Sequence, residues 1–88
     1  MPYYFYILRC SDNSLYCGQT SDLEKRVKQH NTDKHKSAKY LRGRLPVKLV
    51  YFEEFPTLQQ AMKREIQIKK WKKTKKENLI KNNLKLLT

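Results

Sequence analysis

Hydrophobic residues begin the chain as a nearly unbroken run that gives way to a polar turn. Residues 3–9 (YYFYILR) are aromatic and β-branched, and their lack of polar alternation predicts a central strand buried on both faces. Residues 11–14 (SDNS) favour a turn, because Asp and Asn side chains bond to their own backbone. Residues 15–19 (LYCGQ) predict a returning strand, so the first two elements form a β-hairpin.

The register of this hairpin decides whether Tyr6 and Tyr16 share a face of the sheet. A three-residue loop places both phenols on one face, and a two-residue loop separates them. The sequence alone leaves both registers open. Gly18, inside the second strand, predicts that another group approaches the backbone closely.

The hydrophobic spacing changes to that of a helix after residue 20. Residues 21–24 (SDLE) fit a capping box, with Ser21 as the N-cap, and predict a helix over about 22–31. Leu23, Val27 and His30 form its inward face at helical spacing.

One further strand and a second helix follow a basic loop. Residues 32–45 are polar and basic, with a helical turn near 38–41. The alternating, β-branched residues 47–55 predict a third strand. Thr57 is the expected N-cap of the second helix, and Gln60 completes its capping box.

The second helix carries a carboxylate where its hydrophobic pattern predicts burial. Glu65 falls on the apolar side at helical spacing, and burying an unpaired carboxylate is costly. Glu65 must therefore be paired, lie at the edge of a cleft or bind a metal. An ion pair with Lys69, four residues on, is the structural alternative. The apolar positions that define this side are Leu58, Ala61, Met62, Ile66 and Ile68.

The end of the chain is rich in lysine and then in leucine. Six lysines fall within residues 69–76, and a last helix is expected over about 75–87. The element order ββαβαα mixes an antiparallel hairpin with helices. It predicts an α/β (α+β) sandwich that forms a single domain of residues 1–88.

Charge and composition narrow the classes of function. Lys and Arg number 20 against 8 Asp and Glu, a net charge of +12, which favours nucleic acid as partner ahead of an anionic membrane surface. No apolar run approaches the roughly 20 residues that a bilayer span needs. The two cysteines are too few for a disulfide scaffold, so a cytoplasmic protein is expected. A membrane-surface helix over 69–87 is the weaker alternative.

Two constellations of polar residues have competing interpretations. Arg26 and His30 lie one helical turn apart and together suit a phosphate, although a solvated arginine and a half-buried histidine would look the same. Cys10, Cys17, His30 and His35 approach zinc-finger spacing. The first gap is six residues where a finger has two to four, which argues against zinc.

Several motifs follow one another in a fixed order along the chain. Residues 4–6 (YFY) and 16–18 (YCG) form a pair across the turn, and residues 20–27 (TSDLEKRV) form a helix with an arginine. Together with Glu65 on the second helix, this set resembles the GIY-YIG nuclease superfamily. Residues 38–44 (AKYLRGR) and 47–55 (VKLVYFEEF) resemble its small single-domain bacterial branch. The resemblance covers about residues 3–80.

The resemblance implies a three-stranded antiparallel sheet flanked by helices and divalent-metal-dependent hydrolysis of phosphodiester bonds. Tyr16 would activate the attacking water, assisted by Tyr6. Arg26 would stabilise the charge on the phosphoryl oxygens, and His30 would position the water or the phosphate. Glu65 would hold one Mg²⁺ or Mn²⁺ ion. Two further positions, Gln19 and Asn78, are tentative members of the site.

The expected function is a metal-dependent endonuclease that acts on DNA in preference to RNA, with low sequence specificity and no membrane partner. A partner protein could direct it. The alternative is a non-catalytic nucleic-acid-binding module with a vestigial nuclease site. The basic residues expected to contact the nucleic-acid backbone are Lys34, Lys36, Lys39, Arg42, Arg44, Lys69, Lys70, Lys72 and Lys73.

Overall fold

The computed structural model describes residues 2–33 and 35–83. Its elements follow the predicted order ββαβαα, with one short 3-10 helix (η1) in the long loop. Along the chain they are β1 (Tyr3–Arg9), β2 (Leu15–Thr20), α1 (Leu23–Thr32), η1 (Lys39–Leu41), β3 (Lys48–Phe55), α2 (Leu58–Lys69) and α3 (Lys73–Asn82).

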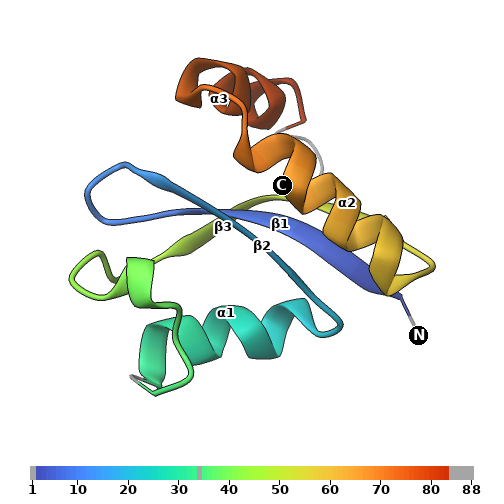
Figure 1. Ribbon diagram of the computed structural model, residues 1–88. Coiled ribbons are helices and arrows are strands. Elements are labelled where there is room, and N and C mark those ends of the chain that lie inside the picture. Colours follow the sequence, from blue (N-terminus) through green and yellow to red (C-terminus); the bar gives the residue numbers. More distant parts are fainter. Residues whose placement is uncertain (1, 34, 84–88) are drawn as a thin grey trace.

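The three strands form one antiparallel sheet in the order β2-β1-β3, so β1 is the central strand, as its sequence predicts. Helix α1 covers one face of the sheet, and α2 and α3 lie on the other (Figure 1). The predicted α+β architecture is therefore confirmed. None of the described helices is long and apolar enough to cross a membrane.

The hairpin between β1 and β2 has the three-residue loop. The Cys10 N–H donates to the Ser14 carbonyl at 2.9 Å, and Asn13 between them has a positive φ of 70°. Asn tolerates this left-handed conformation better than most residues do. In the resulting register Leu8 faces Tyr16 and Tyr6 faces Gly18. Tyr6 and Tyr16 therefore share one face of the sheet.

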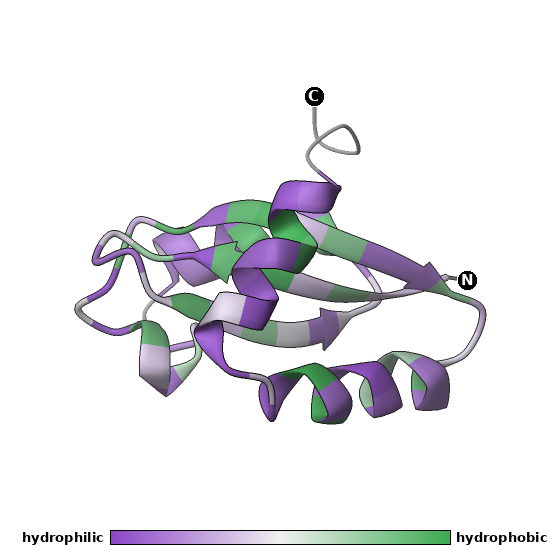
Figure 2. Cartoon of the chain, turned by 90° about the horizontal axis from the view of Figure 1, so that it is seen from above, coloured by the Kyte–Doolittle hydropathy of each residue, from purple (hydrophilic) through white to green (hydrophobic). Residues whose placement is uncertain are grey.

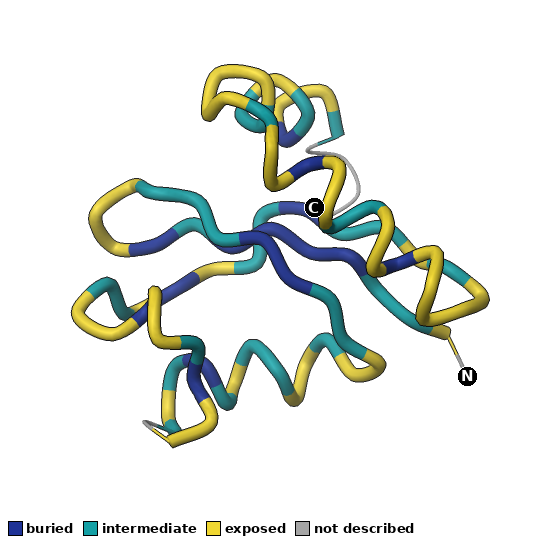
Figure 3. The backbone as a smooth tube through the Cα atoms, in the orientation of Figure 1, coloured by how far each residue is buried: buried dark blue, intermediate teal, exposed yellow. Residues whose placement is uncertain are grey.

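Two hydrophobic clusters lie on the two faces of the sheet. Burial is concentrated in the strands, and each helix turns an exposed side outward (Figure 3). Hydrophobic residues gather on the strands, whereas the helices alternate between hydrophobic and polar residues along their length (Figure 2). The buried residues are Phe5, Ile7, Cys17, Tyr51, Ile68 and Ile80 on the α2–α3 side, and Tyr6, Leu8, Cys10, Leu41 and Val47 on the α1 side.

The start of α1 differs from the prediction by one residue. Asp22 is the N-cap and its carboxylate accepts the Lys25 N–H, so Ser21 lies outside the helix. Ser21 and Asp22 both offer a side-chain oxygen that can cap a helix. The path of the backbone decides which of the two is the N-cap of α1. The predicted N-cap of α2 is confirmed, because Thr57 Oγ1 accepts the Gln60 N–H at 3.3 Å.

The buried side of α2 is narrower than predicted. Ala61 and Ile68 are buried, but the apolar side chains one step around the helix are exposed, because the sheet contacts only one side of α2. The exposed fractions are 38% for Leu58, 44% for Met62 and 56% for Ile66.

The last helix begins and ends earlier than the expected range 75–87. Helix α3 starts at Lys73, two residues sooner, with Lys72 as its N-cap, and it ends at Asn82. Ile80 is buried against the sheet. The predicted continuation over 84–87 lies outside the described residues.

Candidate active site

Tyr6 crosses the α1 face of the sheet to lie over the backbone of Gly18. A Cβ atom at position 18 would fall 2.6 Å from Tyr6 Oη, closer than side-chain packing permits. This contact is the close approach that Gly18 predicts. The side chain of Tyr6 is 1% exposed, and its hydroxyl forms a hydrogen bond of 3.0 Å with His30 Nε2.

His30 connects α1 to the loop that follows it. Its side chain is completely buried, and the Ala38 N–H points at Nδ1 from 3.4 Å. An amide N–H can only donate, so the network assigns the imidazole proton to Nε2, which donates to Tyr6. Burial and the charge of Arg26 lower the pKa of His30 to about 4, so the ring is neutral at pH 7.

Tyr16 stands beside His30 in a stack of aromatic rings. The ring centroids of Tyr16 and His30 are 5.6 Å apart in an edge arrangement. Tyr40 of η1 also stacks on Tyr16, with ring centroids 6.0 Å apart and planes 25° apart. The Arg44 guanidinium lies 4.3 Å from the centroid of the Tyr40 ring. This arrangement holds the phenol of Tyr16 in one orientation.

Sequence reasoning missed Tyr40 as a member of this cluster. Two contacts hold the Arg44 guanidinium over the Tyr40 ring. Arg44 Nη1 donates to the Tyr40 carbonyl at 2.7 Å, and Arg44 Nε forms an ion pair with Asp12 at 3.1 Å. The only sequence signal is the spacing of four residues between an exposed tyrosine and an arginine. The stack on Tyr16 itself depends on where the long loop returns to the sheet.

Arg26 projects from the exposed edge of α1 toward the loop. Its Nη1 donates to the Lys36 carbonyl at 2.7 Å and to Gln29 Oε1 at 3.2 Å. The guanidinium charge also lowers the pKa values of Tyr6 and Tyr16, although burial raises both by more. Arg26 is therefore positioned beside both phenols with part of its donor set already engaged.

Glu65 lies on the flank of α2 that faces β2. Arg64, the preceding residue, faces the other way and pairs with Glu53 of β3 at 2.8 Å. The Glu65 charge acts in the opposite direction to Arg26 and raises the pKa of both Tyr6 and Tyr16. The charge of a carboxylate on the α2–α3 side of the sheet thus acts on two tyrosines of the other face.

Glu65 is paired with Lys69, the alternative that the sequence leaves open. Lys69 Nζ lies 2.7 Å from Glu65 Oε2, and the Glu65 side chain is 20% exposed. The carboxylate raises the pKa of Lys69, chiefly through this hydrogen bond. The lysine charge in turn lowers the pKa of Tyr16, so Lys69 belongs to the electrostatics of the site.

The donor set suits one hard divalent ion. Mg²⁺ is typically held by one or two carboxylates, with water and substrate phosphate completing its shell. Glu65 supplies one partly exposed carboxylate, and no group of three or more His, Cys, Asp or Glu residues suited to a metal occurs within residues 2–33 and 35–83. The residues therefore fit a Mg²⁺ or Mn²⁺ ion shared with substrate and do not fit a zinc finger. Cys10 and Cys17 are buried in different hydrophobic clusters.

The remaining predicted site residues fall into three groups. The first group is exposed, as residues that contact a nucleic-acid backbone must be: Lys36, Lys39, Arg42, Lys70 and Lys72. Lys69 and Lys73 form ion pairs within their own helices, and Arg44 is engaged as described above. Lys34 lies outside the described residues.

The two tentative positions are less closely tied to the tyrosines. Gln19 faces the α2 side of the sheet, opposite Phe5 in the register, and Asn78 is exposed on α3. The side chains of Tyr6, Tyr16, His30 and Tyr40 form the tyrosine cluster. Within the described part of the chain, no hydrogen bond joins the side chain of Gln19 or Asn78 to it. Their assignment stays a prediction.

Comparison with known proteins places this fold and these motifs in a class. The family model of the GIY-YIG catalytic domain matches residues 2–78. The chain therefore belongs to the GIY-YIG family, whose domain is of the nuclease type. The expected resemblance is confirmed over nearly the whole range assigned to it.

Within this family, the chain is similar to small proteins named UPF0213. The UPF0213 protein CPE1444 of Clostridium perfringens is 54% identical over 77 residues, which cover 88% of this chain and 81% of that protein. HQ_3675A of Haloquadratum walsbyi is 51% identical, covering 88% and 84%. The solution NMR structure of the UPF0213 protein BH0048 from Bacillus halodurans matches with a TM-score of 0.60 at 42% identity, covering 94% of this chain and 86% of that one.

Proposed function

We propose that this protein is a divalent-metal-dependent endonuclease that hydrolyses DNA phosphodiester bonds with low sequence specificity. The observation that carries the proposal is the grouping of a buried phenol (Tyr6), a half-buried phenol (Tyr16) and a neutral histidine, whose phenols lie within the electrostatic influence of an arginine and a carboxylate. Tyr6 and Tyr16 both sense the charges of Arg26 and Glu65. The net charge of +12 supports a polyanionic substrate.

Each side chain has a role that its surroundings support. The phenolate form of Tyr16 accepts a proton from the attacking water at its Oη. Burial raises the pKa of this phenol, and the charges of Lys69 and Arg26 oppose that shift. Tyr6 and His30 act as a fixed pair that orients the groups beside Tyr16. Arg26 turns its guanidinium toward the phosphoryl oxygens. Glu65 would hold the metal ion, which would supply positive charge to polarise the scissile phosphate.

Cleavage assays with single-residue variants test this proposal. Supercoiled plasmid, linear duplex, single-stranded DNA and RNA are incubated with the protein in Mg²⁺ or Mn²⁺. We expect nicking that Glu65→Gln abolishes and that Tyr16→Phe lowers by about 10² to 10⁴, the usual contribution of a general base. DNA affinity, measured by fluorescence anisotropy, should remain within about twofold.

Matched controls separate the site from general effects of mutation. Glu54→Gln removes an exposed carboxylate from β3, and Tyr3→Phe removes a hydroxyl from the end of β1. Both variants should cleave as the unaltered protein does. Salt-sensitive binding without cleavage on any substrate in either metal would overturn the proposal in favour of a non-catalytic nucleic-acid-binding module.

A further inference from the structure

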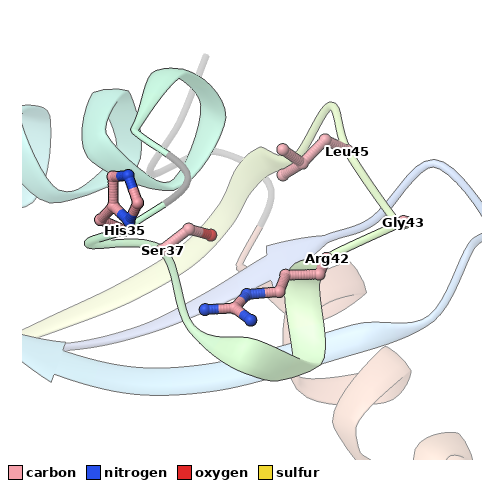
Figure 4. Close-up of a pocket in the computed structure, with 5 residues that line it drawn as sticks. All are labelled: His35, Ser37, Arg42, Gly43 and Leu45. Carbon is pink, nitrogen blue, oxygen red and sulfur yellow. The ribbon is translucent and has the colours of Figure 1, made fainter.

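A cavity of about 390 Å³ opens beside the loop that joins α1 to β3. Its lining residues are His35, Ser37, Arg42, Gly43 and Leu45. Figure 4 shows the Ser37 hydroxyl and the Arg42 guanidinium facing the same space, with His35 on one side and Leu45 on the other. The volume lies within the range of small-molecule sites. None of the residues assigned to phosphodiester cleavage lines this cavity.

Ser37 contributes an unpaired hydroxyl to this cavity. Its side chain is 7% exposed, and in the described part of the chain it is the buried side-chain oxygen that has no hydrogen-bond partner. The backbone N–H of Ser37 does have a partner, because it donates to the Asp33 carbonyl at 2.9 Å. Native proteins seldom leave such a group unsatisfied, because desolvating it without a partner costs free energy. A bound group that accepts its hydrogen would remove the cost.

The lining offers donors and one apolar wall. Arg42 supplies a planar fork of N–H groups, Ser37 an O–H and His35 a ring N–H. No carboxylate is among the described residues that line the cavity. The nearby Asp33 carboxylate is already engaged, accepting the backbone N–H groups of His35 and Lys36. A lining made of donors favours an anion, and the arginine fork matches the geometry of phosphate.

Gly43 shapes the rim of the cavity through its backbone conformation. Its φ of 81° lies in the left-handed region, where residues with a Cβ are disfavoured. The turn at Gly43 brings the chain back so that Arg42, just before it, and Leu45, two residues after it, border one space (Figure 4). The apolar side chain of Leu45 suits a deoxyribose or base attached to the phosphate.

We propose that this cavity is a binding pocket for the phosphate of a nucleotide, distinct from the cleavage site. Ser37 and Arg42 bind the phosphate oxygens, and Leu45 contacts the attached nucleoside. The nucleotide can be free or part of a strand. The idea that this nucleotide belongs to the strand being cut rests on the proposed nuclease function. The existence of the phosphate pocket does not depend on that function.

The same loop connects the pocket to the tyrosine cluster. The Lys36 carbonyl accepts from Arg26 at 2.7 Å, and the Ala38 N–H points at His30 Nδ1. Ser37 lies between these two residues. A phosphate bound by Ser37 would therefore lie one residue away from the backbone groups that contact Arg26 and His30.

Amide chemical shifts measured by NMR on metal-free protein test the pocket directly. The probes are deoxyadenosine monophosphate, inorganic phosphate and deoxyadenosine. We expect the monophosphate to shift the amides of Ser37, Gly43 and Leu45 in a saturable way. Inorganic phosphate should shift the same amides more weakly, and deoxyadenosine should leave them nearly unchanged.

Variants then separate a built site from general attraction to a basic protein. Arg42→Gln should weaken monophosphate binding at least about tenfold, since hydrogen bonds to charged groups contribute about 1.5–3 kcal/mol. Lys28→Gln removes the same charge from the exposed face of α1 and should leave binding within about twofold. Equal losses in the two variants, or shifts spread over the lysine-rich surface, would overturn the proposal.

Ser37→Ala gives a second, independent readout. Because the hydroxyl has no partner in the free protein, its removal should leave the melting temperature unchanged or raise it, while weakening monophosphate binding several-fold. A lower melting temperature with unchanged binding would contradict the assignment. If a 5′-phosphorylated single-stranded oligonucleotide competes with the monophosphate, a strand can fill the pocket. If it does not compete, the pocket accepts only free nucleotides. Retained binding in Glu65→Gln separates the pocket from the nuclease site.

Discussion

The hydroxyl of Tyr6 lies over the backbone of Gly18, where a Cβ atom would come within 2.6 Å of it. The two residues face each other across the β1–β2 register. The missing side chain on β2 is what allows the phenol to reach His30 at 3.0 Å. A glycine in an edge strand thus determines where the Tyr6 hydroxyl sits.

Replacement of this glycine should disturb both stability and the tyrosine cluster. The added methyl of Gly18→Ala must displace Tyr6, and we expect a loss of about 1–3 kcal/mol in the free energy of unfolding, as for overpacked cores. Urea denaturation measures the change. Gln19→Ala, at the next position of β2, is the control and should cost less. An unchanged unfolding midpoint in Gly18→Ala would show that Tyr6 moves aside freely.

Stability should depend on pH through His30. Its pKa is about 4 in the folded protein against 6.5 ordinarily, so between these values the unfolded chain binds the proton more readily. Protonation then favours unfolding, and stability should fall as the pH is lowered from about 6.5 toward 4. Thermal melts across this range measure the slope.

The chain provides its own control for the histidine effect. His30→Gln should flatten the slope between pH 6.5 and 4, whereas His35→Gln, at an exposed position, should leave it unchanged. NMR titration of the imidazole in the unaltered protein gives the same pKa without mutation. A His30 ring that titrates near 6.5 contradicts the buried, neutral assignment.

A divalent ion and Lys69 compete for the same carboxylate. Lys69 Nζ lies 2.7 Å from Glu65 Oε2 in a half-buried pair. Ion pairs at this helical spacing typically contribute only about 0.3–0.5 kcal/mol. The ion should therefore displace the lysine readily. We expect Lys69→Gln to tighten Mn²⁺ binding at least about twofold and Glu65→Gln to abolish it, as measured by paramagnetic line broadening. Lys70→Gln, which removes the neighbouring charge, should have a smaller effect; equal effects would point to charge alone.

Much of the fold could be predicted from the sequence because its strongest signals are local. The aromatic run of β1 fixes a buried central strand, and the side-chain oxygen of Thr57 correctly marks the start of α2. The misplaced carboxylate of Glu65 could likewise be found from helical spacing alone. Its pairing could not, because Lys69 and a metal ion are equally compatible with the pattern.

The failures share a dependence on tertiary placement. Helical spacing shows that Leu58, Met62 and Ile66 lie on one side of α2, but the position of the sheet beneath decides that this side is exposed. Tyr40 reaches Tyr16 only through the path of the long loop, which no local pattern describes. The register of the hairpin depends on the length of its turn, and the residues of this turn are compatible with more than one turn type.

Binding of DNA should depend on salt through lysines that are not engaged within the protein. Lys72 is exposed at the start of α3, whereas Lys75 lies 4.2 Å from the centroid of the Trp71 ring, which holds its ammonium group against the protein. Each phosphate contact contributes about 0.9 to the slope of log K against log salt concentration on duplex DNA. Lys72→Gln should therefore lower that slope by about 0.9, and Lys75→Gln by less. Anisotropy titrations over a range of salt concentrations measure both slopes, and an unchanged slope in Lys72→Gln would remove this lysine from the interface.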